Sequence, residues 1–137
     1  MKYCKFLVVL VFFGCAKNDV ERNPFLQEVA FEQTVNLSLP AFDNLNYQGG
    51  SLYWPYGGIR GVLLFNLAGA IMAWEASCPN HAPSDCSTTQ IDGITASCAC
   101  EDYQYSLATG QPLTEGATYS LLFYKVQQNG TQVRIYN

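Results

Sequence analysis

The chain is poor in charged residues, which make up 13% of its 137 positions, and its bases are outnumbered by its acids. Seven Lys and Arg stand against eleven Asp and Glu, which gives a formal net charge of −4 at pH 7. Nucleic acids and anionic lipid surfaces bind proteins through clustered positive charge. The composition therefore argues against a nucleic-acid partner and against electrostatic docking on lipid. The many aromatic and β-branched residues supply a compact core.

The N-terminus lacks an apolar run long enough to span a bilayer. Residues 6–13 form an unbroken apolar run of eight residues, whereas a spanning helix needs about 20. This run follows Lys2 and Lys5, and a basic start before a short apolar run is typical of a signal peptide. Residues 1–14 are therefore interpreted as a signal peptide. A plain secretion signal or a membrane-embedded N-terminus are the alternatives to lipoprotein processing.

A Gly-Cys pair that ends at Cys15 follows the apolar run and resembles the bacterial lipobox, although Phe12 and Phe13 depart from its usual residues. The resemblance implies an acylated Cys15, a membrane partner through that lipid, and a place in the bacterial cell envelope. The chain would be an outer-membrane lipoprotein that faces the periplasm or the surface. Residues 17–19 resemble surface-export signals of some Bacteroidetes lipoproteins. The residues from 16 to 24 are polar and have no apolar periodicity, and residues 15–28 are expected to form a flexible tether.

The sequence has no internal repeat and no stretch with the periodicity of an amphipathic helix. Short runs rich in aromatic and β-branched residues alternate instead with Gly and Pro turns, which favours antiparallel strands. The predicted strands lie at 29–39, 51–56, 62–67 and 71–76, and a hairpin is predicted at 88–94. Residues 29–137 are therefore predicted to form one small all-β domain.

The clearest local signal is Asn129-Gly130, which lies between the apolar-patterned runs 119–128 and 131–136. Asn-Gly between such runs is the strongest signal for a two-residue hairpin turn. The register that this turn implies pairs Val126 with Val133, Tyr124 with Ile135, and Lys125 with Arg134. The first two pairs would form an apolar face, and the third would place like charges opposite each other in solvent.

Two cysteine clusters and the single histidine of the chain carry its chemistry. The first cluster has the sequence Cys78-Pro-Asn-His81 and continues to Cys86, and the second has the sequence Cys98-Ala-Cys-Glu101. Their order and spacing resemble the two loops of the Rieske iron–sulfur family, in which two Cys and two His hold a 2Fe–2S cluster. The resemblance covers roughly residues 55–137. It implies a small antiparallel β sandwich or barrel with both loops at one end.

The ligand positions of that family are only partly kept. Cys78 and Cys98 correspond to the Cys ligands, His81 lies one place after the first His, and Glu101 stands where the second His belongs. These four residues would form the metal site if a cluster were retained. Asn80 occupies the register of the first His, and neither an amide nor a carboxylate suits an iron–sulfur centre. The missing histidine argues for a member of the family without a cofactor, and a 2Fe–2S cluster is the alternative.

The cysteine count favours disulfides. Once Cys4 leaves with the signal peptide and Cys15 is acylated, four Cys remain, which is an even number in an exported chain. Their spacing alone leaves three connectivities open, and it does not match the paired C-x-x-C of zinc sites. The resemblance implies the pairs Cys86–Cys100 and Cys78–Cys98. The absence of a twin-Arg pair argues the same way, because exported Rieske proteins typically cross the membrane folded by that route.

No nucleophile motif accompanies His81, and the adjacent acids Glu101 and Asp102 would point to opposite faces of a strand, so we expect no enzyme activity. The preferred interpretation is an envelope lipoprotein whose Rieske-like domain has lost its cluster and has a binding or structural role. Its partner would be an unidentified envelope protein. The alternative is a Rieske-type electron carrier with a redox partner, as are the ferredoxin subunits of nitrite reductases and ring-hydroxylating dioxygenases.

Overall fold

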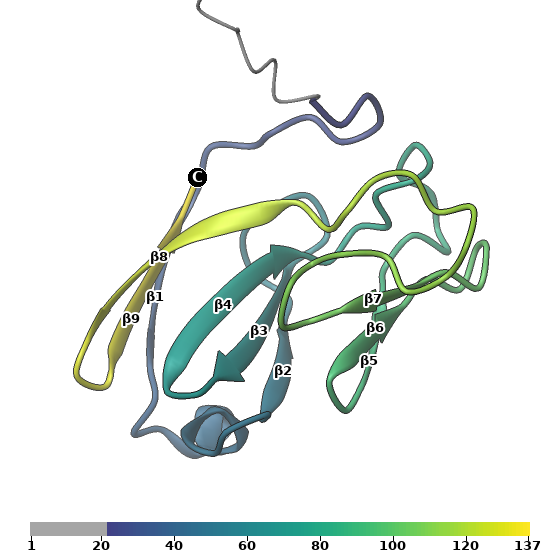
Figure 1. Cartoon of the computed structure of the whole chain (residues 1–137). Coiled ribbons are helices and arrows are strands. Elements are labelled where there is room, and N and C mark those ends of the chain that lie inside the picture. Colours follow the sequence, from purple (N-terminus) through teal and green to yellow (C-terminus); the bar gives the residue numbers. More distant parts are fainter. Residues whose placement is uncertain (1–21) are drawn as a thin grey trace, which may run out of the picture.

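The computed structural model describes residues 22–137, so the predicted signal peptide and Cys15 lie outside the described residues. Within this range nine strands form two antiparallel sheets, and the prediction of an all-β fold is confirmed (Figure 1). No helix between residues 22 and 137 is long and apolar enough to cross a membrane.

The larger sheet is curled and has the strand order β1-β9-β8-β4-β3-β2. Its strands, in chain order, are β1 (Glu32–Asn36), β2 (Ser51–Trp54), β3 (Val62–Leu67), β4 (Ala70–Glu75), β8 (Phe123–Asn129) and β9 (Gln132–Tyr136). The smaller sheet consists of β5 (Gln90–Asp92), β6 (Thr95–Ser97) and β7 (Gln104–Ser106). Figure 1 shows the smaller sheet beside β2, β3 and β4, with the two cysteine-bearing loops at one end of it.

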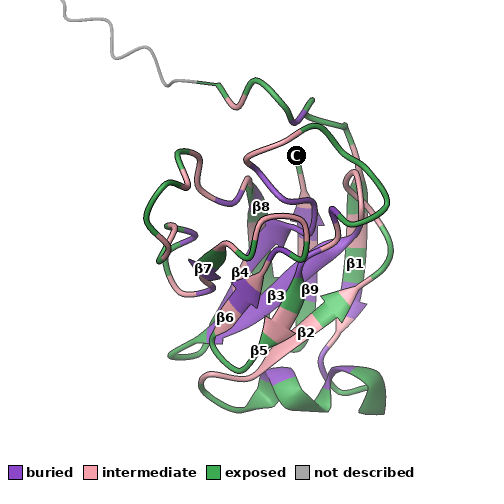
Figure 2. Cartoon of the chain, turned by 90° about the vertical axis from the view of Figure 1, so that its right-hand side faces the viewer, coloured by how far each residue is buried: buried purple, intermediate pink, exposed green. Residues whose placement is uncertain are grey.

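Strand β3 runs between two hydrophobic cores and is buried on both faces (Figure 2). Val62 and Leu64 belong to the core that the curled sheet encloses, whereas Leu63 and Phe65 belong to the core under the smaller sheet. Side chains alternate between the two faces of a strand. A strand with apolar residues at every position therefore needs a core on each side, and this explains the uninterrupted run of apolar residues in β3.

The sequence does not predict η1, a 3-10 helix at Pro40–Asn46 that covers one end of the first core. Pro40 begins the helix, and Phe42 and Leu45 are its buried residues. The i to i+3 spacing of these two side chains matches the three residues per turn of a 3-10 helix. So short a segment does not show the 3.6-residue period of an α-helix.

The C-terminal hairpin forms where it is predicted, but its predicted register is wrong. Asn129 pairs with Gln132, so Gly130 and Thr131 are the central residues of the turn. Gly130 has a φ of 59°, which fits the Gly at the first central position of a type II′ turn. The turn therefore lies one residue later than Asn-Gly would place it, and each strand residue meets a partner two positions further on.

The corrected register pairs Val126 with Ile135 and Lys125 with Tyr136. A shift of two residues keeps every side chain on its predicted face, because side chains alternate with a period of two. The predicted like-charge pair of Lys125 and Arg134 is not formed. Arg134 instead reaches strand β1, where its Nη2 lies 2.5 Å from Oε2 of Glu32.

A buried carboxylate joins the larger sheet to the loop that follows β2. Glu75 ends β4, is fully buried, and accepts hydrogen bonds from three backbone N–H groups: those of Ile59 (2.7 Å), Arg60 (2.9 Å) and Ser77 (2.8 Å). The hydroxyl of Tyr124 donates a fourth bond. Burial, together with Glu75, raises the pKa of Tyr124 far above its usual value. A buried carboxylate is tolerated only when it is hydrogen-bonded, and the loop after β2 supplies two of these four bonds.

Replacement of Gly58 by Ala should lower the free energy of unfolding more than the same change at Gly69. Both residues have positive φ (64° and 94°), so Ala costs about 1–2 kcal/mol of strain at either position. A Cβ at Gly58 also lies 2.4 Å from Oε2 of Glu75 and would disturb its hydrogen bonds, whereas a Cβ at Gly69 meets nothing within 4 Å. We expect a total loss of about 3–4 kcal/mol for Gly58→Ala in urea unfolding. Equal losses in the two variants would contradict the role of Glu75.

Ala68→Gly should stabilise the protein. Ala68, in the turn between β3 and β4, has a φ of 52°. This left-handed backbone conformation costs free energy for every residue that has a Cβ. We expect a gain of about 1 kcal/mol in the free energy of unfolding. Ala70→Gly, the same chemical change in the adjacent strand, is the matched control and should cost about 0.5–1 kcal/mol. A loss for Ala68→Gly as large as that for Ala70→Gly would refute the strain at residue 68.

Candidate functional site

Backbone hydrogen bonds close the two cysteine-bearing loops at their bases. In the first loop, between β4 and β5, the N–H of Cys78 donates to the carbonyl of Ser87 at 2.7 Å. In the second loop, between β6 and β7, the N–H of Cys98 donates to the carbonyl of Tyr103 at 2.8 Å. The base of the second loop continues the paired strands β6 and β7, whereas the first loop is closed by an isolated bridge between Ser77 and Thr88. Closed in this way, the two loops place Cys78 and Cys98 opposite each other.

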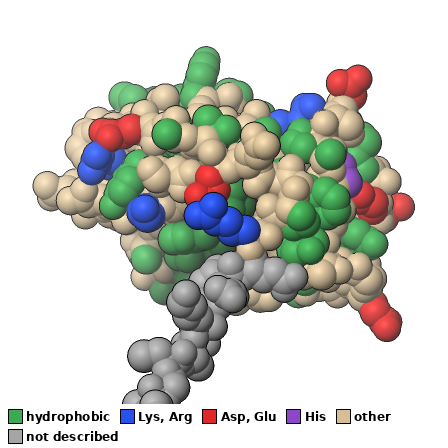
Figure 3. All heavy atoms as spheres, turned by 90° about the horizontal axis from the view of Figure 1, so that it is seen from above, with side chains coloured by type: hydrophobic (Ala, Val, Ile, Leu, Met, Phe, Trp, Pro, Cys, Tyr) green, Lys and Arg blue, Asp and Glu red, His purple; other side chains and the backbone are tan. Residues whose placement is uncertain are grey.

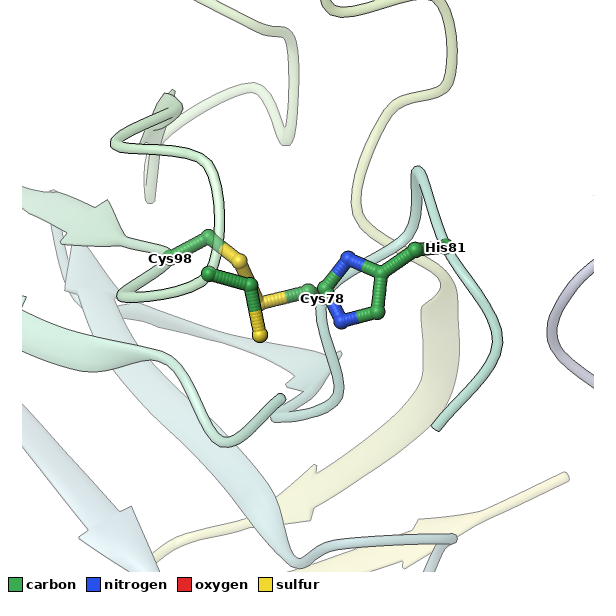
Figure 4. Close-up of side chains that lie close together, drawn as sticks. Cys78, His81 and Cys98 are labelled. Carbon is green, nitrogen blue, oxygen red and sulfur yellow. A yellow bond between two sulfur atoms is a disulfide. The ribbon is translucent and has the colours of Figure 1, made fainter. Parts of the chain in front are cut away.

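Two disulfides join the loops, with the connectivity that the resemblance implies. Cys78 bonds to Cys98, and we call this bond the inner disulfide because the two residues are 0% and 1% exposed. Cys86 bonds to Cys100, and we call this bond the outer disulfide because Cys86 is exposed. The two Cα–Cα distances are 5.8 Å and 5.4 Å. Figure 4 shows the inner disulfide with the imidazole of His81 turned toward it.

His81 bridges the two loops. Its Nε2 lies 2.7 Å from Oγ of Ser87 in the first loop. Its Nδ1 lies 2.5 Å from Oε1 of Glu101 in the second loop, which is an ion-pair distance without the angles of a hydrogen bond. In Figure 3 the histidine lies at the rim of the molecule with acidic side chains beside it. The imidazole is thus held between the loops and is partly open to solvent.

All four residues that the resemblance assigns to a metal site lie together. The donor atoms of Cys78, His81 and Cys98 are within 4.8 Å of one another, and Oε2 of Glu101 is 3.4 Å from Sγ of Cys98. The sulfur of Cys100 belongs to the same group, which the sequence does not predict. The donor set does not fit a Rieske cluster, because a Rieske iron takes two imidazoles. The chain has one imidazole, and it faces a carboxylate.

Asn80, in the register of the missing histidine, is a structural residue. Its amide group donates to the hydroxyl of Tyr105 (2.8 Å) and to the carbonyl of Tyr119 (2.9 Å). Its amide oxygen accepts from the N–H groups of Thr118 and Tyr119. Burial raises the pKa of Tyr105 to about 12, so its hydroxyl stays neutral at physiological pH. The side chain of Asn80 thus anchors the loop between β7 and β8, which we call the third loop, and no local sequence signal identifies this role.

The chain segment just before β1 also contacts the first cysteine loop. The amide group of Asn23 donates to the carbonyl of Pro79 at 2.7 Å, and its oxygen accepts from the N–H groups of Phe25 and Leu26. Leu26 is buried, and the ring of Phe25 meets that of Tyr119 edge to face. Part of the predicted tether, residues 23–26, therefore lies against the domain beside Cys78.

No protein-family model matches the sequence, and no curated protein matches it. Solved structures do match. A chain from the complex of reduced oxygenase and oxidised ferredoxin of carbazole 1,9a-dioxygenase aligns with a TM-score of 0.53 and 19% identity, over 77% of this chain and 92% of that one. The ferredoxin of Sphingomonas yanoikuyae aligns with a TM-score of 0.48 and 15% identity, over 66% of this chain and 88% of that one. The plasma membrane Rieske protein of Synechocystis aligns with a TM-score of 0.47 and 21% identity, over 62% of this chain and 82% of that one.

These identities are too low to carry a function from one protein to another, and only the first similarity is close enough to support an argument about the fold. It supports the fold as a whole, which in this chain consists of the curled antiparallel sheet, the small three-stranded sheet and the two facing cysteine loops. Residues 22–137 therefore contain a domain with the fold of the Rieske-type ferredoxins.

Proposed function

We propose that this chain is an envelope lipoprotein whose Rieske-like domain has exchanged its 2Fe–2S cluster for two disulfides and has a binding or structural role. The inner disulfide is the observation that supports this proposal. Cys78 and Cys98 are the residues that would ligate iron, and their sulfurs are bonded to each other in a fully buried position. A Cys sulfur in a disulfide is not the thiolate that binds a metal.

The substituted positions support the same conclusion. Asn80 uses both its donors and its acceptor oxygen within the protein, and Glu101 is paired with His81. Neither side chain is left over to bind a metal. The two disulfides and these polar contacts hold the two cysteine loops together in place of a cluster. The compartment fits as well, because an oxidising envelope keeps disulfides formed.

An electron carrier with a 2Fe–2S cluster is the second candidate, and one observation favours it. The donor atoms of Cys78, His81, Cys98 and Cys100 lie within 4.8 Å of one another, which is the kind of grouping that a metal site needs. This candidate requires both Cys pairs to be reduced and a second histidine that the chain does not have. Its partner would be a redox protein, whereas the preferred function has an envelope protein as its partner.

Protein purified from the cell envelope without air should contain neither iron nor acid-labile sulfide and should have no free thiol at Cys78, Cys86, Cys98 or Cys100. The sequence separations are 20 and 14 residues, so each disulfide should contribute about 3 kcal/mol to stability. Complete reduction should therefore lower the melting temperature by at least about 10 °C and leave the visible spectrum unchanged. Stoichiometric iron and sulfide, with a visible spectrum that reduction bleaches, would establish the electron carrier instead.

Cys15→Ala should release the protein from the membrane fraction, because the proposed anchor is a lipid on that sulfur. Cys4→Ala is the matched control. Cys4 lies in the predicted signal peptide, so the variant should remain membrane-bound and should incorporate labelled fatty acid. Membrane association of the Cys15→Ala variant at the level of the unchanged protein would refute the anchor and leave the account of the domain intact.

A further inference from the structure

The two disulfides lie against each other. The sulfur of Cys100, from the outer disulfide, is within 4.8 Å of the sulfurs of both Cys78 and Cys98, which form the inner disulfide. Cys86 is exposed and Cys100 is partly buried, whereas Cys78 and Cys98 are inaccessible. A thiol from solvent therefore reaches the outer bond and not the inner one. Any exchange at the inner bond has to start from a residue of the protein itself.

We propose that the outer disulfide is a thiol–disulfide exchange site and that Cys100 relays the exchange to the inner disulfide. A dithiol of the C-x-x-C class attacks the sulfur of the exposed Cys86, breaks the Cys86–Cys100 bond, and leaves as its own disulfide. Both cysteines are then thiols, and two electrons have entered. The sulfur of Cys100 next attacks Cys78, forms Cys78–Cys100 and breaks Cys78–Cys98. The proton of Cys100 ends on Cys98, and this second step moves no further electrons.

The loop geometry determines which inner sulfur is attacked. Cys98 and Cys100 are separated by one residue of the same loop, so a bond between them would close a tight ring. Cys78 comes from the opposite loop, and a Cys78–Cys100 bond keeps the two loops joined. Attack on one sulfur of a disulfide releases the other as the leaving thiol. The product is therefore expected to have free thiols at Cys86 and Cys98.

The leaving thiol has a partner in place. Oε2 of Glu101 lies 3.4 Å from Sγ of Cys98, within reach of a hydrogen bond from an S–H group. The other oxygen of Glu101 is held at 2.5 Å from Nδ1 of His81. The carboxylate is thus oriented toward the sulfur that the exchange releases. Since the attacking and attacked sulfurs are fixed in one site, the relay has the advantage of an intramolecular reaction over attack from solution.

The inference rests on the proposed function, because it requires both disulfides in the native protein. It is tested on the full protein purified from the membrane. Free thiols are first blocked with iodoacetamide, the sample is treated with limiting dithiothreitol, and new thiols are then alkylated with a heavier reagent and mapped by mass spectrometry. The molecules that have accepted two electrons should carry the heavy label on Cys86 and Cys98. Heavy label on Cys86 and Cys100, with Cys78–Cys98 intact, would overturn the relay.

The variants Cys86→Ser and Cys100→Ser give a matched pair, because each lacks the outer disulfide and each retains one of its cysteines. In Cys86→Ser the free thiol is on Cys100, so part of the protein should carry the label on Cys98 without any reductant. In Cys100→Ser only Cys86 should be labelled, and dithiothreitol should open the inner disulfide at least about ten times more slowly than in Cys86→Ser. Equal rates would overturn the relay.

The same experiment separates this inference from the proposed function. Blocking of all four cysteines in the untreated sample would show that the native protein lacks both disulfides, and both proposals would then fall. Four protected cysteines followed by label on Cys86 and Cys100 would leave the proposed function standing and remove the relay alone.

Discussion

The carboxylate of Glu75 is buried among four hydrogen-bond donors that come from three separate parts of the fold. Two are the N–H groups of Ile59 and Arg60 in the loop that follows β2, one is the N–H of Ser77, and one is the hydroxyl of Tyr124 on β8. Each buried donor left without a partner costs about 1–3 kcal/mol, so none of these parts can move away alone. Ser77 immediately precedes Cys78. The position of the inner disulfide therefore depends on a carboxylate that lies outside the cysteine loops, at the end of a central strand.

A metal cluster and a pair of disulfides solve the same structural problem, which is to hold together two loops with little regular secondary structure. In the proposed function the cross-links are made by sulfur alone, and the neighbouring positions have become a polar network around them. Asn80 supports the third loop, and His81 and Glu101 join the two cysteine loops. A fold can be kept while the chemistry of its site changes, which is why the likeness to ferredoxins does not by itself assign electron transfer to this chain.

The predictable parts of the structure are those that depend on local pattern. The run at 62–67 has the composition of a doubly buried strand, and it forms β3 with those limits. The facing arrangement of the cysteine loops follows from the family resemblance. The register of the last hairpin could not be derived from Asn129-Gly130 alone. The ion pair of Arg134 with Glu32 on β1 also contributes to whether the turn forms at Asn129-Gly130 or at Gly130-Thr131. Likewise Glu75 has no sequence signature, since its donors come from residues up to 49 positions away.

The contact of Asn23 with Pro79 gives the domain an unusual mechanical property. A pull along the chain from its N-terminal side acts first on residues 23–26, which lie on the first cysteine loop, and only afterwards on β1. The load thus enters next to Cys78, where covalent bonds tie both loops together. Strand β1 lies at the edge of the larger sheet and is held there by hydrogen bonds to β9 alone. This edge strand is therefore shielded from tension for as long as the Asn23 contact holds.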